Sequence, residues 1–203
     1  MKVALIGITG RVGSRLLDEL LARGHQVTGI VRDASNSASR PDFHIKTADA
    51  TDTGQLAPLL VDHDAVVSAS NFVSSDPRAL LAALKQAGVQ RLLVVGGAGS
   101  LEVAPGQALV DSAGFPEAYR PEAEAGRAFL DVLRTERALD WTFLSPSAEF
   151  DPGARTGRFR LGGDQLLLDS SGRSWISMED FAVALVDELE RPAHSRQRFT
   201  VGY

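Results

Sequence analysis

The feature that most constrains this chain is a glycine-rich turn close to its start. An apolar run, Val3–Ile6, is followed by Gly7, Gly10 and Gly13, at intervals of three residues. Apolar side chains then recur at helical spacing between residues 12 and 21. A short apolar run predicts a buried strand, and the later periodicity predicts an amphipathic helix. The segment is therefore predicted to be a strand, a tight turn and a helix in close succession.

This turn has the composition of a phosphate-binding loop. Glycines between a strand and a helix leave backbone N–H groups open at the positive end of the helix dipole, where an anion is favoured. The dinucleotide fingerprint is G-x-G-x-x-G, and the first interval here is one residue longer. A strand-to-helix turn without a ligand is the alternative. The strand before and the helix after the glycines favour phosphate binding.

Further apolar runs of strand length alternate with helical patterns along the chain. The predicted strands are Gln26–Val31, Phe43–Lys46, Ala65–Ala69, Arg91–Val95 and Trp141–Leu144. The predicted helices span about 12–24, about 56–60, 76–88 with Asp76-Pro77 as start and Gly88 as end, and about 121–139. Continuous apolar runs suit strands that are covered on both faces. We therefore expect an α/β fold with a doubly wound parallel sheet.

The pattern changes after Phe150. We predict three short strands there, Arg158–Leu161, Gln165–Leu168 and Ser174–Ile176, the first two paired as a β-hairpin. A helix is expected from Ser177 to about Arg191, with Ser177 and Asp180 at capping-box spacing, and residues 198–203 are expected to form a last strand. We expect one domain over residues 1–203, with residues 151–177 as a small insertion on the substrate side.

Composition excludes several classes of protein. The net charge of −5 argues against a general nucleic-acid binder. The absence of cysteine excludes disulfides and thiolate chemistry, and the four histidines lack metal-ligand spacing, so we expect no metal site. The apolar run before Gly7 is only four residues long, which is too short for a secretion signal, and no apolar stretch approaches the roughly 20 residues that cross a bilayer. We therefore expect a cytoplasmic protein that does not bind membranes.

Arg32 lies just after the second predicted strand, where a bound dinucleotide would place its adenosine ribose. An acid at this place accepts a hydrogen bond from the 2′-hydroxyl of NAD, whereas arginine makes charge-assisted bonds to the 2′-phosphate of NADP. Asp33, the next residue, keeps NAD open as the less favoured alternative. Arg11 in the glycine turn could add a second positive charge. The polar stretch from Asp33 to Asp42 is expected to be a loop.

With "GITGRVG" and "VRD" in place, the chain resembles the atypical short-chain dehydrogenases/reductases. The stretches "LLVVGGAGSLEVAPG", "WTFLSPSAEFDPGARTG" and "SWISMEDFAVALVDELE" resemble one group among them, the NAD(P)H-flavin reductases related to NmrA-like and biliverdin-reductase-B-like proteins. The resemblance covers essentially the whole chain. It implies a Rossmann fold that binds a nicotinamide dinucleotide.

The resemblance also implies a set of cofactor-binding positions. Those of the pyrophosphate loop are Gly7, Thr9, Gly10, Arg11, Val12 and Gly13. The remaining positions are Arg32 at the ribose, Asp49 and Ala50 beside the adenine, Ala69 and Ser70 near the middle of the cofactor, Gly96 and Gly97 at its nicotinamide end, and Ser145 and Pro146 on the same edge. All of them follow strands at their carboxyl ends, where doubly wound sheets bind ligands.

One departure from the family bears on the reaction. Ordinary short-chain dehydrogenases use a Tyr-x-x-x-Lys pair as the acid for carbonyl chemistry, but Tyr119 is followed four residues later by Ala123, and Tyr203 is the last residue. No catalytic residue is therefore assigned. Flavin-like and quinone-like acceptors take a hydride without a strong acid, so we expect an NADPH-dependent reductase with such a small-molecule acceptor.

Two other functions are alternatives to this reductase. The chain could instead be a non-catalytic NADP sensor that regulates a protein partner, as the likeness to NmrA-like proteins implies. An isomerase or epimerase of the extended type is less favoured, because it would need the same missing pair. The sequence leaves open the oligomeric state, the physiological acceptor, and whether a flavin would be substrate or cofactor.

Overall fold

The computed structural model describes residues 1–33 and 42–203 and has a central sheet of eight strands. Their order is β10-β12-β8-β5-β4-β1-β2-β3, and every neighbouring pair is parallel except β10 with β12. The bounds are β1 Lys2–Ile6, β2 Gln26–Val31, β3 Phe43–Thr47, β4 Ala65–Ser68, β5 Arg91–Val95, β8 Asp140–Ser145, β10 Arg160–Gly162 and β12 Gln197–Gly202. The predicted parallel sheet is confirmed.

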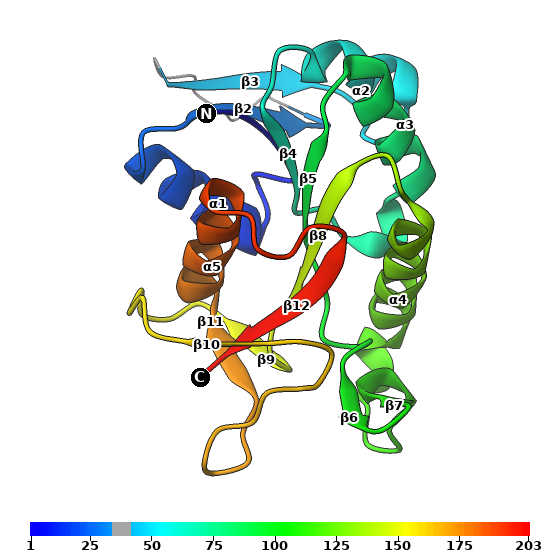
Figure 1. Ribbon diagram of the computed structural model, residues 1–203, viewed down its shortest axis with the longest axis vertical. Coiled ribbons are helices and arrows are strands. Elements are labelled where there is room, and N and C mark those ends of the chain that lie inside the picture. Colours follow the sequence, from blue (N-terminus) through cyan, green and yellow to red (C-terminus); the bar gives the residue numbers. More distant parts are fainter. Residues whose placement is uncertain (34–41) are drawn as a thin grey trace.

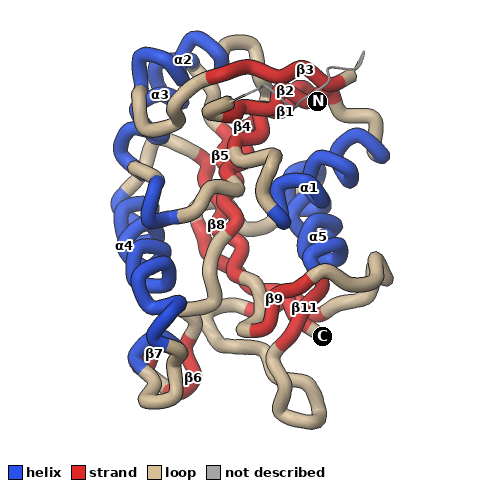
Figure 2. Tube along the Cα trace, turned by 180° about the vertical axis from the view of Figure 1, so that it is seen from behind, coloured by secondary structure: helices blue, strands red, loops and turns tan. Residues whose placement is uncertain are grey.

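Helices cover both faces of the sheet (Figures 1 and 2). They are α1 Arg11–Ala22, α2 Thr53–Leu60, α3 Pro77–Ala87, α4 Arg120–Thr135 and α5 Met178–Glu190, with single-turn 3₁₀ helices η1 Phe72–Ser74, η2 Leu109–Asp111 and η3 Glu117–Tyr119. Helices α1 and α5 bury their apolar side chains in one core, and α2, α3 and α4 bury theirs in a second core across the sheet. This two-sided cover makes the sheet doubly wound.

Several helix ends agree with the sequence prediction. The carboxylate of Asp76 accepts hydrogen bonds from the backbone at the start of α3, and Gly88 ends that helix with a φ of +77°. The Ser177 hydroxyl accepts from the backbone N–H of Asp180 at the start of α5. The helix predicted to reach Leu139 ends at Thr135 instead. Its end is set by Glu136, whose carboxylate accepts hydrogen bonds from the next turn of backbone and bends the chain toward β8.

The predicted β-hairpin at residues 158–168 is wrong. Strand β10 pairs with β12, so that Arg160–Gly162 lies opposite Thr200–Gly202, and residues 165–168 belong to no strand. The edge of β12 offers unpaired backbone groups to β10, and this pairing extends the main sheet. The strand predicted at 174–176 is present as β11, Trp175–Ser177, and pairs with β9, Glu149–Asp151. A separate small hairpin joins β6, Glu102–Ala104, to β7, Gln107–Ala108.

Asp180 does not complete the predicted capping box. Its fully buried carboxylate accepts hydrogen bonds from the backbone of Thr156 and Gly157 at 2.8 Å each, and from the Tyr203 hydroxyl at 2.7 Å. Asp180 is the third residue of α5. Its side chain therefore binds the segment that leads to β10 and does not cap its own helix. These hydrogen bonds hold Thr156 and Gly157 against the start of α5.

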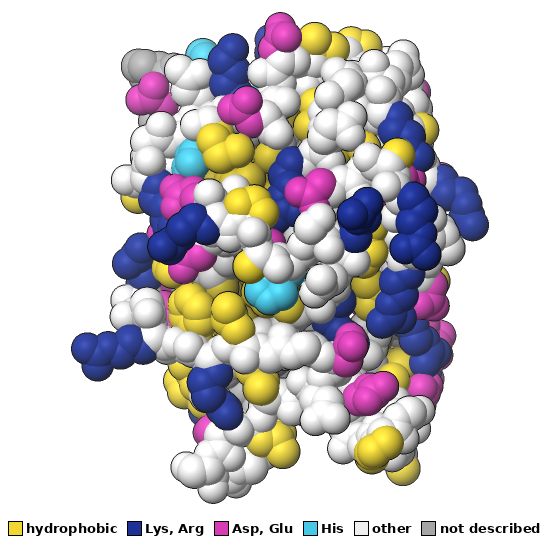
Figure 3. All heavy atoms as spheres, viewed as in Figure 1, with side chains coloured by type: hydrophobic (Ala, Val, Ile, Leu, Met, Phe, Trp, Pro, Cys, Tyr) yellow, Lys and Arg dark blue, Asp and Glu magenta, His cyan; other side chains and the backbone are white. Residues whose placement is uncertain are grey.

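The surface carries charges of both signs. In the face drawn in Figure 3, acidic and basic side chains of the described residues are interspersed, and several basic ones gather over α4. Within residues 1–33 and 42–203, no helix combines the length and the apolar character that crossing a bilayer needs. The cytoplasmic location stays a prediction. Most of the predicted polar loop, residues 34–41, lies outside the described residues.

Candidate functional site

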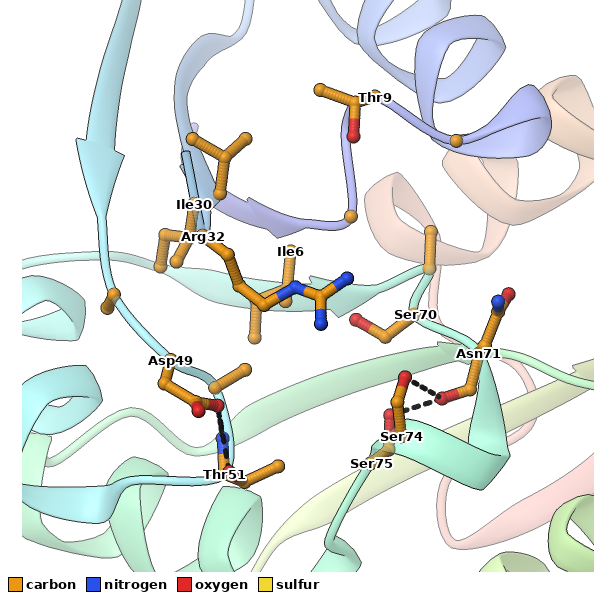
Figure 4. Close-up of a pocket in the computed structure, with 16 residues that line it drawn as sticks. Ile6, Thr9, Ile30, Arg32, Asp49, Thr51, Ser70, Asn71, Ser74 and Ser75 are labelled. Carbon is orange, nitrogen blue, oxygen red and sulfur yellow. Dashed lines mark hydrogen bonds between the residues drawn. The ribbon is translucent and has the colours of Figure 1, made fainter. Parts of the chain in front are cut away.

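A cavity of about 250 Å³ lies at the carboxyl ends of β1, β2, β3 and β4. Strand β1 pairs with β2 on one side and with β4 on the other, so the chain reverses its direction across the sheet at this point. Such a switch point leaves a crevice between the loops that follow the two strands. The wall contains eight residues predicted from the sequence, namely Gly7, Thr9, Gly10, Arg32, Asp49, Ala50, Ala69 and Ser70 (Figure 4).

Two of the three glycines are required by the fold itself. Gly7 has a φ of +84°, and a Cβ there would lie 2.6 Å from the carbonyl oxygen of Ala69. A Cβ on Gly13 would lie 2.1 Å from the carbonyl oxygen of Gly7. No side chain fits at either place, because the loop after β1 touches the loop after β4 and the first turn of α1. These glycines bring strand, loop and helix into close contact.

Gly10 differs from its two neighbours. It is exposed, its φ is −72°, and a Cβ there would lie 3.3 Å from its nearest neighbour, the Gly7 carbonyl oxygen. Gly10 is the N-cap of α1, no side chain caps that helix, and its first turn holds no acid. By contrast, Asp52, Asp76 and Ser177 cap α2, α3 and α5. The backbone amides at the start of α1 are therefore open for an anionic ligand, as a diphosphate requires.

Arg32 brings a positive charge into the same cavity. It follows β2, and its guanidinium extends across the pocket toward Ser70 in Figure 4. Asp49 lies nearby, and its carboxylate accepts hydrogen bonds from the Thr51 backbone at 2.9 Å and from the Thr51 hydroxyl at 2.8 Å. These bonds, assisted by the charge of Arg32, lower the pKa of Asp49. Arg32 can thus bind a phosphate, while Asp49 stays ionised and engaged with Thr51.

Arg11 does not line the cavity. Its guanidinium forms an ion pair of 2.8 Å with Asp151 in β9, and both side chains are mostly exposed. Val12 and Gly13 lie behind the wall in the first turn of α1, where Val12 packs against the core shared with α5. The second positive charge expected in the glycine turn, that of Arg11, is therefore paired with Asp151.

The residues predicted for the nicotinamide end follow β5 and β8 and do not line this cavity. A Cβ on Gly96 would lie 2.4 Å from the Phe143 ring, so close packing of β5 and β8 requires glycine there. Ser145 and Pro146 are buried at the end of β8. The Ser145 hydroxyl has no hydrogen-bond partner among the described residues. Gly97 is the more open neighbour of Gly96, with only ordinary contacts around it.

Sequence reasoning missed part of the cavity wall. Asn71, Ser74 and Ser75 line it from the loop between β4 and α3, and Thr51 lines it after β3. The hydroxyls of Ser74 and Ser75 donate to the carbonyl oxygen of Asn71 at 3.3 and 2.7 Å. The polar run "SNFVSSDP" was the available signal, because it follows a buried strand and precedes a capped helix. Apolar wall residues are the last residues of β1 and β2 and the residue after β3, namely Ile6, Ile30, Val31 and Ala48.

The arrangement suits a dinucleotide. It offers uncapped amides for a diphosphate, a guanidinium for a further phosphate, and an apolar lining for a flat ring. Among the described residues, no group of three or more His, Asp or Glu side chains could hold a metal ion.

Solved structures of known proteins share this fold over the whole chain. A protein from Burkholderia pseudomallei, proposed to be exported, is 44% identical with a TM-score of 0.91, and each chain covers 100% of the other. A proposed epimerase from Bacteroides thetaiotaomicron is 43% identical with a TM-score of 0.94, over 100% of this chain and 96% of that one. A proposed NADH-flavin reductase from Streptococcus pneumoniae is 35% identical with a TM-score of 0.86, over 100% of this chain and 99% of that one.

The sequence profile of a family described as NAD(P)H-binding matches residues 7–192. This span begins at the first glycine of the turn after β1 and includes every wall residue of the cavity except Ile6. The likeness to atypical short-chain dehydrogenases/reductases seen in the sequence is thereby confirmed, and the chain belongs to the NAD(P)H-binding family.

Proposed function

We propose that this protein is a reductase that takes a hydride from NADPH and passes it to a flavin-like or quinone-like acceptor. The observation that carries the proposal is the cavity at the switch point, which combines the uncapped start of α1 with the guanidinium of Arg32. Bound NADPH supplies the hydride. The protein binds and orients the two reactants and keeps water from the reacting atoms.

The glycine loop holds the diphosphate. Backbone amides from Arg11 to Gly13 donate to its oxygens, and the missing side chain at Gly10 lets it approach. Arg32 donates to the 2′-phosphate, which favours NADPH over NADH, with NADH as the weaker alternative. Asp49 and Ala50 lie beside the adenine.

The middle and the nicotinamide end of the cofactor lie along the loops after β4, β5 and β8. Ala69 and Ser70 flank its middle, Gly96 and Gly97 flank the nicotinamide, and Pro146 borders the same end. The acceptor binds beyond them, toward residues 151–177. The order of these positions follows the order of the strands at the carboxyl edge of the sheet.

The missing acid supports the choice of acceptor. Tyr119 is 67% exposed at the start of α4, and Ala123 stands where the lysine of the Tyr-x-x-x-Lys pair would be. A Cβ built on Gly99 would lie 2.7 Å from the Ala123 Cβ, so this part of α4 packs directly against the loop after β5. A flavin or quinone acceptor needs no such acid. An epimerase that uses the Tyr-x-x-x-Lys pair would need this acid. Its absence disfavours, for this chain, the epimerase activity proposed for the Bacteroides relative.

The test is NADPH oxidation by purified protein with FMN, riboflavin and menadione, each compared with a protein-free blank. We expect turnover at least about tenfold above the blank with one or more acceptors, and slower turnover with NADH. Tight NADPH binding without turnover on any acceptor would contradict the reductase and leave an NADP-binding regulator. The relative that is a proposed NADH-flavin reductase makes flavins the first acceptors to try.

A further inference from the structure

The cavity wall after β4 has little support of its own. Asn71, Ser74 and Ser75 belong to a loop around η1, a 3₁₀ helix of three residues. The hydrogen bonds inside this loop are short-range, from Ser75 N–H to the Phe72 carbonyl and from the two serine hydroxyls to Asn71. A single 3₁₀ turn does not hold its own position, because it is too short to be stable alone. Its place over the cavity depends on contacts with other elements.

The strongest polar contact comes from α4, on the other side of the loop. Glu122 Oε1 accepts a hydrogen bond from the Phe72 backbone N–H at 2.6 Å, and Oε2 accepts one from the Val73 N–H at 3.1 Å. Both carboxylate oxygens are therefore used on adjacent amides at the start of η1. Bonds to an ionised acceptor are about twice as strong as neutral ones, and the paired geometry also sets the orientation of the backbone.

An apolar contact acts at the same place. Phe72 is 8% exposed, and a Cβ on Gly126 would lie 2.9 Å from its ring, so the ring rests directly on the backbone of α4. The ring also stacks on Phe143 and meets Phe129 edge-on, with centroid distances of 5.8 and 5.3 Å. Gly126 and Glu122 are four residues apart and share one face of the helix. One face of α4 thus holds η1 through both its backbone amides and its aromatic side chain.

We infer that Glu122 is a positioning residue of the cofactor site. By fixing Phe72 and Val73 it sets where Asn71 and Ser75 stand along the dinucleotide, opposite the glycine loop. The same helix lacks the lysine of the Tyr-x-x-x-Lys pair, with Ala123 in its place. In this protein α4 contributes to the site through the wall it supports. The inference rests on the proposed function, since its ligand is NADPH.

The test compares Glu122→Ala and Glu122→Gln with the wild type by calorimetric titration of NADPH and by steady-state kinetics. We expect Glu122→Ala to raise the Kd and the KM for NADPH about tenfold, with kcat changed less than about twofold, because two charge-assisted bonds to the wall are lost. Glu122→Gln keeps one carbonyl acceptor and should recover part of the affinity. Glu124→Ala, an exposed residue on the same helix, is the matched control and should bind NADPH as the wild type does.

Each outcome decides the matter. A folded Glu122→Ala variant whose Kd stays within twofold of the wild type overturns the inference, as does a fall in kcat without a change in KM. If Glu122→Ala does not fold, the Glu122→Gln variant decides by the same two criteria. A wild type that binds no NADPH overturns the proposed function itself, and this result is distinct because it precedes any variant.

Discussion

The carboxyl and amino ends of the parallel strands form two opposite edges of the central sheet. Charged side chains are paired differently at these two edges. At the carboxyl edge, the guanidinium of Arg32 faces a cavity and the first turn of α1 has no side-chain cap. At the amino edge, Arg91 and Glu188 are only 7% and 4% exposed and form an ion pair of 3.2 Å. His194 adds a contact of 2.8 Å to Glu188. Charge that is paired inside the protein is already compensated, whereas charge facing a cavity is available to a ligand.

The direction of the helices explains part of this difference. In a parallel sheet with crossover helices, helices begin at the carboxyl edge and end at the amino edge. The positive end of α1 therefore meets the cavity, and the negative end of α5 meets Arg91, which also donates to the Glu188 carbonyl at 3.3 Å. An anion is favoured at the first edge and a buried arginine at the second. We can test this contrast by changing each edge separately.

The largest effect is expected at the amino edge. Arg91→Met leaves the buried Glu188 without its guanidinium, and we expect the free energy of unfolding to fall by about 3–5 kcal/mol. Urea denaturation measures this loss. The Kd for NADPH of the folded variant should stay within about twofold of the wild type, since the change is at the opposite edge. A large loss of affinity with unchanged stability would contradict the contrast.

At the carboxyl edge, Gly10→Asp should separate binding from stability. Aspartate is a favoured N-cap but only slightly better than glycine, so the free energy of unfolding should stay equal or rise by only a few tenths of a kcal/mol. The same carboxylate would face the diphosphate, so the Kd for NADPH should rise at least about 100-fold. The matched control is Gly114→Asp, which adds the same charge at an exposed glycine with open space around it. Unchanged NADPH binding by Gly10→Asp would refute the diphosphate site.

A smaller effect is expected at Arg32. Arg32→Ala removes charge-assisted hydrogen bonds worth about 1.5–3 kcal/mol, so the Kd for NADPH should rise about 10- to 150-fold. The Kd for NADH should change little, because NADH lacks the 2′-phosphate. Parallel titrations with both nucleotides measure the difference. Equal losses for the two would show that Arg32 does not read the phosphate, and Arg191→Ala, exposed at the end of α5, serves as a charge-matched control.

The smallest effect concerns a carboxylate on the face between α1 and α5. Glu19 is 5% exposed and pairs with Arg155 and Arg23 at 2.7 and 2.8 Å. The hydrogen bond from Arg155 is the main cause that lowers the pKa of Glu19 below its usual 4.5, against the opposing effect of burial. A carboxyl group whose pKa is lower in the folded state stabilises the protein above the unfolded pKa, and this contribution disappears as pH falls through the folded value.

Glu19→Gln should therefore cost about 1 kcal/mol of unfolding free energy at neutral pH. The gap between the wild type and the variant should shrink as pH falls below about 4.5. Urea denaturation across this range measures the gap. A gap that is constant with pH would mean that the charge of Glu19 does not stabilise the fold.

Much of the fold follows from short-range features that the sequence shows directly. Asp76 and Gly88 begin and end α3 as predicted, because a cap needs only its own helix turn. Gly7 and Gly13 are demanded by contacts within one strand–turn–helix unit and with the adjacent loop. The alternation of continuous apolar runs and amphipathic helices was enough to predict the doubly wound sheet. The early end of α4 has a local cause at Glu136, but the other corrections concern pairing between distant segments.

The candidate site was likewise predictable only in part from the sequence. The residues that follow β1 and β2 could be named from spacing and position along the chain. Asn71, Ser74 and Ser75 could not, because they carry no periodic pattern and enter the wall only when β4 packs beside β1. Glu122 escaped notice for a similar reason, since its partners Phe72 and Val73 are about 50 residues away and nothing local marks the contact.

By itself, the sequence determined the βα units, the glycine turn and the positive charge after the second strand, because periodicity, steric demand and charge act within a few neighbouring residues. Tertiary structure alone decided that β10 pairs with β12, that Arg11 pairs with Asp151, and that α4 supports the cavity wall. A backbone edge or an isolated charge has many acceptable partners. Only the packing of the whole chain brings one of them within reach.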